Sequence, residues 1–346
     1  MYREPIYRLP PFKTELVIGA LAETVDWGLT AYGIPDVWKQ SRGRGIRVAV
    51  LDTGIDVTHK DLDGAILEAK DFTRSPGGYR DVAGHGTHCA GVIGARQNDT
   101  GVVGICPDLR MDDGGLLIGK VLGDDGAGLE SWIAAGIDWA VERGAHLLSL
   151  SFGSPTASPT IFQAIFRAVA RGVFVVAAAG NNGADNSVDY PGRYRETIAV
   201  GAVDRHGRVA KFSSRGNEVD TAAPGEDVLS TFPGNRYAKL SGTSMATPFV
   251  TGVVALMLSK HREQGSATPI RTTDDLREHL ARTATDAGSP GKDPSYGYGL
   301  INPKSMLGPA DTDQLPSWAG LRLELDVGDE PAALVLVPRD AKVTIG

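Results

Sequence analysis

The sequence is poor in cysteine, in long apolar runs and in positive charge. Its two cysteines, Cys89 and Cys106, allow at most one disulfide bond. No stretch approaches the run of about 18 apolar residues that a membrane span requires. The first residues lack a basic segment followed by an apolar one, so we expect no export signal, a cytoplasmic protein and free thiols. With a net charge of −7 and no basic block, we expect no nucleic-acid and no membrane partner.

Short apolar runs alternate with segments of helical periodicity along most of the chain. We expect strands at 46–51, 116–122, 145–152, 173–179 and 197–203, and helices at 129–143, 160–171, 244–261 and 273–284. This alternation predicts a three-layer, doubly wound α/β fold with a mostly parallel sheet and helices on both faces.

The pattern divides the chain into three parts. Residues 1–22 contain three prolines and are predicted to form an extended N-terminal segment. Residues 23–308 are predicted to form one large α/β domain. In residues 309–346 the pattern changes to period two at 321–327, followed by a β-like run at 333–337, which predicts a small C-terminal β appendage.

Four polar residues stand where predicted strands end or helices begin. Asp52 and Asn181 each follow an apolar strand, and His85 and Ser244 each precede a helix of small or apolar residues. The carboxyl ends of parallel strands collect ligands, and a helix amino end favours negative charge. A hydroxyl, an imidazole and a carboxylate are the groups of Ser/His/Asp catalysis, which needs a base within about 2.6–3.2 Å of the hydroxyl.

Other residues of the same types compete for these roles. His88 lies one helical turn beyond His85, and we expect it to be structural. Asp56 and Asp61 follow Asp52, but neither ends the buried strand.

The motifs Asp-Thr-Gly, His-Gly-Thr-His and Gly-Thr-Ser-Met-Ala around Asp52, His85 and Ser244 resemble those of the subtilisin-like serine proteases, or subtilases. The resemblance extends from about residue 23 to residue 303. It implies that Asp52 orients His85, that His85 is general base and then acid, and that Ser244 attacks a peptide carbonyl. Asn181 and the Ser244 N–H would stabilise the oxyanion. One departure is Phe249, where the family usually has histidine, and it concerns the packing of the helix.

The resemblance also implies a cleft that holds an extended peptide by strand addition. Its edges would be formed by two segments: Gly126, Ala127 and Gly128, and Ser151, Phe152 and Gly153. The pocket for the residue before the cleaved bond would be walled by 177–181, which includes Gly180, and by 188–191. If Asp189 points into this pocket it should favour Lys or Arg, and if it points outward it is a solvated loop carboxylate.

Calcium is the cofactor that the resemblance implies, because Ca²⁺ takes oxygen ligands. A first site would take the Asp61 carboxylate, the Asn98 side chain, the carbonyls of Arg96, Thr100 and Val102, and a ligand from Glu23. A second, weaker site would take the carbonyls of Gly192, Tyr194 and Thr197 with the carboxylates of Glu218 and Asp220. The alternative at the second site is two solvated acids on a turn.

The segment Arg8-Leu9-Pro10-Pro11-Phe12 is similar to the short propeptide of the intracellular subtilisins, the branch of the family that this chain resembles most. That propeptide lies across the active site with a proline that displaces the scissile bond. The alternative is a disordered tail. The intracellular members also imply a homodimer.

We therefore expect a calcium-stabilised serine endopeptidase that acts on proteins or peptides through an acyl-enzyme. An esterase or amidase with the same triad and a catalytically silent binding module are the alternatives. A dehydrogenase is disfavoured, because no Gly-x-Gly-x-x-Gly motif opens a helix after the first predicted strand.

Overall fold

A seven-stranded parallel sheet forms the centre of the computed structural model, which describes residues 4–17, 22–264, 270–308, 321–323 and 335–337. The strand order is β10-β9-β8-β7-β3-β5-β4, and every neighbouring pair is parallel. These strands are β3 (Arg47–Asp52), β4 (Ile66–Asp71), β5 (Gly115–Lys120), β7 (Leu147–Leu150), β8 (Phe174–Ala178), β9 (Ile198–Val203) and β10 (Val219–Pro224).

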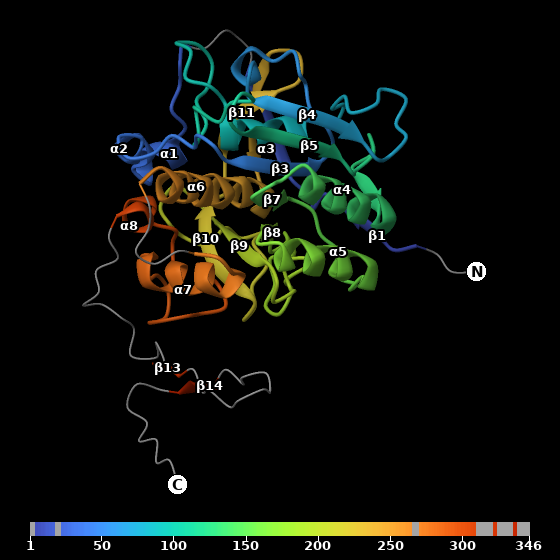
Figure 1. Cartoon of the computed structure of the whole chain (residues 1–346). Coiled ribbons are helices and arrows are strands. Elements are labelled where there is room, and N and C mark those ends of the chain that lie inside the picture. The colour runs from blue at the N-terminus through green and yellow to red at the C-terminus, as the bar shows by residue number, and fades with distance from the viewer. Residues whose placement is uncertain (1–3, 18–21, 265–269, 309–320, 324–334, 338–346) are drawn as a thin grey trace.

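Helices cover both faces of this sheet, with α4 and α5 together on one side and α6 on the other (Figure 1). Side chains alternate along the buried strands, so that Val48 and Val50 of β3 join one core and Leu51 joins the other. The first core includes residues of α3 (His85–Gly94) and α6 (Thr243–Gln264), and the second includes residues of α4 (Glu130–Glu142) and α5 (Pro159–Ala170). The predicted three-layer α/β fold is thereby confirmed.

Smaller elements surround the main sheet. The remaining helices are α1 (Trp27–Ala31), α2 (Ile34–Val37), the 3-10 turn η1 (Lys60–Leu62), α7 (Thr273–Thr283) and α8 (Pro303–Leu307). Strands β11 (Val228–Phe232), β12 (Arg236–Ser241) and β2 (Lys13–Val17) form an antiparallel sheet. Two further antiparallel pairs are β1 (Ile6–Arg8) with β6 (Ala127–Leu129), and β13 (Leu321–Leu323) with β14 (Val335–Val337).

The expected strands and helices are all present, with ends displaced by at most three residues. Strands β4 and β10 were not expected, and they are the two outermost strands of the main sheet. In the C-terminal region the β13–β14 pair agrees with the period-two pattern, and the rest of 309–346 lies outside the described residues. Among the helices of the described residues, none combines the length and the apolar character needed to cross a lipid bilayer.

The strand order places the candidate site. The strands that follow β3 in the chain, β4 and β5, lie on one side of it, and β7 to β10 lie on the other. The winding therefore reverses between β3 and β7, where open α/β sheets form a crevice at the carboxyl ends of the strands. Asp52 is the last residue of β3, and Ser151 directly follows β7.

Candidate active site

Asp52 and His85 form a buried pair at this crevice. Both side chains are inaccessible to solvent. Nδ1 of His85 lies 2.8 Å from Oδ1 and 3.0 Å from Oδ2 of Asp52, and the Thr53 N–H donates to Oδ1 at 2.7 Å. Because a carboxylate only accepts hydrogen bonds, Nδ1 carries the proton and Nε2 is left as the basic nitrogen.

Asp81, which the sequence interpretation did not single out, aligns the strand and the helix that carry this pair. Its carboxylate accepts from the Thr53 hydroxyl at 2.9 Å and from the backbone N–H groups of Gly84 and Thr87 at 2.7 and 2.8 Å. The Thr53 hydroxyl in turn accepts from the N–H of Gly86 at 2.9 Å. The spacing of an acid four residues before the histidine, at a helix start, is the signal that could have identified it.

The surroundings of His85 favour its protonated form. Burial lowers the pKa of the imidazole, but the charge and the hydrogen bond of Asp52 oppose it, and the pKa lies well above its ordinary value. His88 behaves in the opposite way, because burial lowers its pKa to about 3. Nε2 of His88 lies 2.9 Å from the Val228 carbonyl and 3.1 Å from the Ala238 carbonyl, which is a structural role.

Ser244 is the second residue of α6 and is also fully buried. Its hydroxyl donates to the Ser151 carbonyl at 3.0 Å, and the Ser151 hydroxyl donates to the Ser244 carbonyl at 2.9 Å. Within the part of the chain that the structure describes, Nε2 of His85 has no hydrogen-bond partner. Cys89 contacts both residues, with Sγ 3.8 Å from Nδ1 of His85 and 3.4 Å from the Ser244 carbonyl. The serine is thus adjacent to the pair, with its hydroxyl turned toward Ser151.

Asn181 follows β8 and presents its amide to the same place. Its Oδ1 accepts from the N–H and the hydroxyl of Thr243 at 2.9 and 2.8 Å, so the amide NH₂ points the other way and donates to the Pro11 carbonyl at 2.9 Å. The Ser244 N–H belongs to the first turn of α6, where N–H groups have no partner within the helix. These two donors can stabilise an oxyanion.

The N-terminal segment lies between the two edges that were expected to bind substrate. Strand β1 pairs antiparallel with β6, with Tyr7 opposite Gly128 and Arg8 opposite Ala127. On the other edge, the N–H of Arg8 donates to the Gly153 carbonyl at 3.1 Å, and the N–H of Gly153 donates back at 3.0 Å. The described residues of this segment are therefore ordered by strand addition, as the extended conformation at its prolines had indicated.

Aromatic contacts reinforce this pairing. Tyr7 is fully buried, and its ring makes an edge contact with Phe152, with the centroids 6.1 Å apart. The Phe12 ring lies over His85 at a centroid distance of 5.0 Å. The His85 imidazole is consequently covered by the chain's own N-terminal segment.

Asp189 is buried close to both walls of the cleft. Its N–H donates to the Ala179 carbonyl at 2.9 Å, and its carboxylate lies against Gly153 and Gly180. Phe249, the departure from the family pattern, is buried and packs on Tyr32 with the ring centroids 5.5 Å apart. Phe249 belongs to the hydrophobic core that includes α3 and α6.

Most groups of the first expected cation site lie together. The buried carboxylate of Asp61 lies 3.2 Å from Nδ2 of Asn98 and accepts from the Val102 N–H at 2.9 Å. Glu23 binds the same loop by accepting from the N–H groups of Asn98 and Asp99 at 2.7 and 2.9 Å. No described residue donates a hydrogen bond to the carbonyls of Arg96, Thr100 or Val102. The Asp61 carboxylate and these carbonyls are oxygen ligands of the kind that Ca²⁺ takes, whereas Oδ1 of Asn98 accepts from the N–H and the hydroxyl of Thr100 at 3.2 and 3.1 Å.

The groups of the second expected site already have protein partners. Asp220 lies 2.9 Å from Nε of Arg277, whose Nη2 donates to the Thr197 carbonyl at 2.8 Å. Glu218 pairs with Arg193 at 3.0 Å. The carbonyls of Gly192 and Tyr194 accept from the Thr197 hydroxyl. Because the Arg277 guanidinium supplies the positive charge, this cluster does not fit a metal ion, and Asp220, at 2% exposed, is not a solvated acid either.

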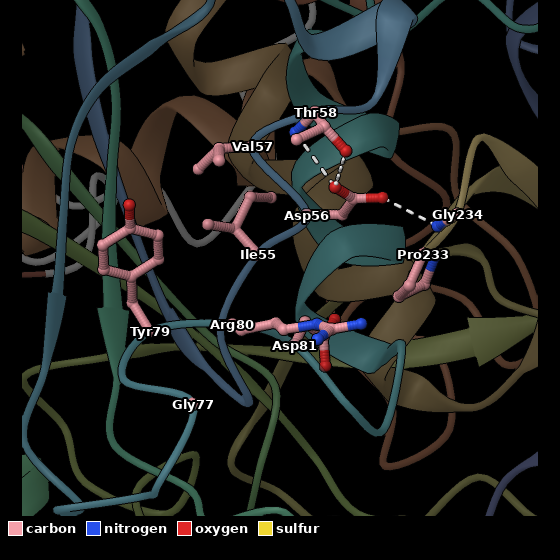
Figure 2. A pocket seen from close by; sticks show the side chains of 10 residues that line it. All are labelled: Ile55, Asp56, Val57, Thr58, Gly77, Tyr79, Arg80, Asp81, Pro233 and Gly234. Carbon is pink, nitrogen blue, oxygen red and sulfur yellow. Dashed lines mark hydrogen bonds between the residues drawn. The ribbon is translucent and has the colours of Figure 1, made fainter.

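A pocket of about 460 Å³ lies beside the site, between the loop after β3 and the β11–β12 turn (Figure 2). Asp56 is its central acid. Figure 2 shows its carboxylate between Thr58, which donates its N–H and hydroxyl, and the N–H of Gly234 at 2.7 Å. Burial raises the pKa of Asp56, but these donors oppose it and the net pKa is lowered. The acid is engaged in joining two loops, and it is not part of the Asp52–His85 pair.

The fold and the buried pair define an α/β serine hydrolase, and comparison with known proteins identifies the family. Residues 43–299 match the model of the Subtilase family. Subtilisin BL of Lederbergia lenta is 44% identical over 282 residues, which cover 81% of this chain and 98% of that protein. An intracellular serine protease of Paenibacillus polymyxa is 46% identical over 282 residues, covering 79% of this chain and 84% of that protein. The chain belongs to the subtilase family and is a subtilisin-type serine protease.

Replacing Asp52 by asparagine should lower the pKa of His85, because the effect of burial would no longer be opposed by the charge and the hydrogen bond of the Asp52 carboxylate. An NMR titration of the imidazole measures this directly. Asp56→Asn, which removes a nearby carboxylate that does not contact His85, is the control and should leave the titration unchanged.

Asp52→Asn should also change how the free energy of unfolding depends on pH. A histidine whose pKa is raised on folding contributes its full stabilisation below the unfolded pKa of about 6.5, and loses it as the pH rises through the folded pKa. The free energy of unfolding of the unmodified protein should therefore fall across that window, and that of Asp52→Asn should not. A His85 titration that is identical in the two proteins would contradict the assignment.

Proposed function

We propose that the chain is an endopeptidase that hydrolyses peptide bonds by an acyl-enzyme mechanism with Asp52, His85 and Ser244 as its triad. The observation that carries the proposal is the buried His85 ring, held by both oxygens of Asp52, with its basic Nε2 unpartnered among the described residues and with Cys89 contacting both the ring and the Ser244 carbonyl.

In the first half of the reaction, the Ser244 hydroxyl turns from the Ser151 carbonyl toward Nε2 of His85, which takes its proton as Oγ bonds to the substrate carbonyl carbon. The oxyanion accepts from the Ser244 N–H and from Nδ2 of Asn181. When the carbon–nitrogen bond breaks, His85 returns the proton to the leaving amine. A water molecule then repeats the sequence on the acyl-enzyme and regenerates Ser244.

Two features favour peptides over simple esters. The cleft edges at β6 and Gly153 present backbone groups that bind any extended peptide, as they bind β1. Several relatives are proteases by name, including an alkaline protease of Alkalihalobacillus alcalophilus that is 43% identical over 286 residues, 82% of this chain and 70% of that protein. A silent binding module would not need the oriented amide of Asn181.

The N-terminal segment is proposed to inhibit the protease. In an antiparallel pair, Arg8 opposite Gly153 places Pro10 opposite Ser151. A substrate residue at that point would donate its N–H to the Ser151 carbonyl, but proline has none, and the Ser244 hydroxyl donates there instead.

Pro10 lies opposite Ser151, but the carbonyl that accepts from the oxyanion donor Asn181 belongs to Pro11. Because these two positions differ, neither proline aligns a peptide bond for attack by Ser244. This register supports inhibition by the intact segment of 1–22.

Calcium is proposed to bind at the first cluster, through Asp61, Asn98 and the carbonyls of Arg96, Thr100 and Val102. Bound there, it would neutralise the buried Asp61 carboxylate and hold the 96–102 loop, which Glu23 joins to the start of the main domain. The similarity to an intracellular serine protease supports the prediction of a cytoplasmic protein. The homodimer stays a prediction.

The triad is tested by labelling the full chain with a fluorophosphonate, which reacts with an activated serine. Ser244→Ala should abolish labelling, because it removes the attacking oxygen. Ser259→Ala is the matched control, since Ser259 is a second buried serine of the same helix, and it should be labelled as the parent is. Both substitutions are made in a full chain that also carries Tyr7→Glu. This change is expected to displace β1 and so to open the cleft to the label. Absence of labelling in that chain would favour the binding module.

Inhibition is tested by Tyr7→Glu in the full chain. A carboxylate cannot be buried against Phe152 without a large cost, so β1 should leave the cleft and labelling should become at least about 10-fold faster. Ile6→Glu is the control, because Ile6 is the adjacent residue of β1 and is 47% exposed. A point substitution is preferable to deletion, which would also remove β2 and its pairing with β12. Equal labelling rates in the two variants and the parent would exclude inhibition.

The calcium site is tested by thermal unfolding with and without EDTA. Removing the ion should lower the Tm by about 5 °C or more, because binding to the folded state alone stabilises it. Asp61→Asn should make the Tm insensitive to EDTA. Asp99→Asn, an exposed acid of the same loop, should keep the sensitivity. A Tm of the parent that is unchanged in excess EDTA would contradict the site.

A further inference from the structure

Asp189 joins the two backbone segments that bracket the cleft. Its N–H donates to the Ala179 carbonyl, two residues before Asn181, and the next residue, Tyr190, exchanges hydrogen bonds of 2.8 and 2.9 Å with Ser154. The residue is thereby fixed between the segment that carries the oxyanion donor and the edge that pairs with an extended peptide.

Two glycines leave room for its side chain. A Cβ at Gly153 would lie 2.8 Å from the Cβ of Asp189, and a Cβ at Gly180 would lie 2.5 Å from its Oδ2. Gly180 also has a φ of +107°, a conformation that other residues rarely adopt. The Asp189 side chain therefore lies against both glycines, and any larger residue at either position would displace it.

The carboxylate is poorly compensated. It is 9% exposed, and its side-chain donor is Nδ2 of Asn182 at 3.3 and 3.4 Å, longer than a typical hydrogen bond of about 2.9–3.0 Å. The nearby arginines are engaged elsewhere, Arg193 with Glu218 and Arg215 with Asp185, and no cation of the described residues pairs with Asp189. Burial raises the pKa of Asp189, against the lowering effect of Asn182. A buried acid without a cation is destabilising, and a basic ligand would relieve it.

The N-terminal segment does not supply that cation. The residue opposite Ser151 is Pro10, which is buried but uncharged, and Arg8, two residues earlier, is exposed. The segment thus occupies the cleft without satisfying Asp189.

We propose that Asp189 determines the specificity of the protease by selecting arginine or lysine as the residue before the cleaved bond. This inference rests on the proposed endopeptidase function and names its substrate class. The basic side chain would extend between the Ser151–Gly153 and Ala177–Asn181 segments, and its positive charge would face the Asp189 carboxylate. In the alternative that the sequence left open, Asp189 points outward and its carboxylate is solvated. A residue that is only 9% exposed does not fit that alternative.

The test uses tetrapeptide anilides that differ only in the residue before the anilide: arginine, citrulline, lysine, phenylalanine or leucine. Citrulline has the shape of arginine without its charge, so the ratio of kcat/KM for arginine to that for citrulline isolates the charge. In the full chain with Tyr7→Glu, we expect a ratio of at least about 30, the loss typical when one partner of a buried charge pair is removed. Arginine and lysine should also exceed phenylalanine and leucine.

Asp189→Asn in the same background should reduce the ratio to about 1, and a cooperative thermal unfolding transition of this variant, with the circular dichroism spectrum of the parent, checks that it is folded. Asp185→Asn, on the same loop, removes an exposed carboxylate and should keep the ratio. A labelled parent that cleaves arginine and citrulline peptides equally, or an Asp189→Asn variant that keeps the preference, would overturn the inference and leave the protease function standing. A chain that is neither labelled nor active on any peptide would overturn both.

Discussion

The contact between Asp52 and His85 is the constraint on which the rest of the site depends. A charged pair without solvent exposure is costly unless its remaining lone pairs and protons are satisfied. Here the carboxylate receives the Thr53 N–H, and Asp81 fixes the end of β3 to the start of α3 through Thr53 and Gly84. The central sheet and the helix packed on it therefore act as a rigid support for one imidazole ring.

The cleft recognises main-chain groups, and this property explains why the chain can occupy its own site. Backbone hydrogen bonds along β6 and Gly153 do not distinguish β1 from a substrate. The distinction comes from two consecutive prolines, since the missing N–H of Pro10 leaves the Ser151 carbonyl to the Ser244 hydroxyl. Under the proposed inhibition, substrate recognition and protection of the site would use the same strand geometry, separated by one residue in register.

Buried acids of this protein are compensated in different ways. Asp220 is neutralised within the chain by the Arg277 guanidinium, which also binds the Thr197 carbonyl. Asp61 faces an amide, a backbone N–H and a loop whose carbonyls have no described partner, an arrangement suited to an added cation. Among side chains, Asp189 has only a long contact with Asn182, and we propose that a basic substrate side chain supplies its partner. The protein partner of Asp220 is observed, whereas the metal partner of Asp61 and the substrate partner of Asp189 are proposals based on what surrounds each acid.

The amino-acid sequence alone predicted the βαβ order and the approximate ends of the expected strands and helices, and its family motifs predicted the candidates Asp52, His85, Asn181 and Ser244. These depend on local periodicity and on residues at strand and helix ends, which neighbouring residues reveal. The three-dimensional arrangement was needed to show that Asp81 supports the start of the His85 helix, that Arg277 pairs with Asp220, and that Arg8 lies opposite Gly153, which places Pro10 opposite Ser151. Arg277 is 57 residues from Asp220 in the chain, and no local pattern encodes a contact that the packing of distant elements creates.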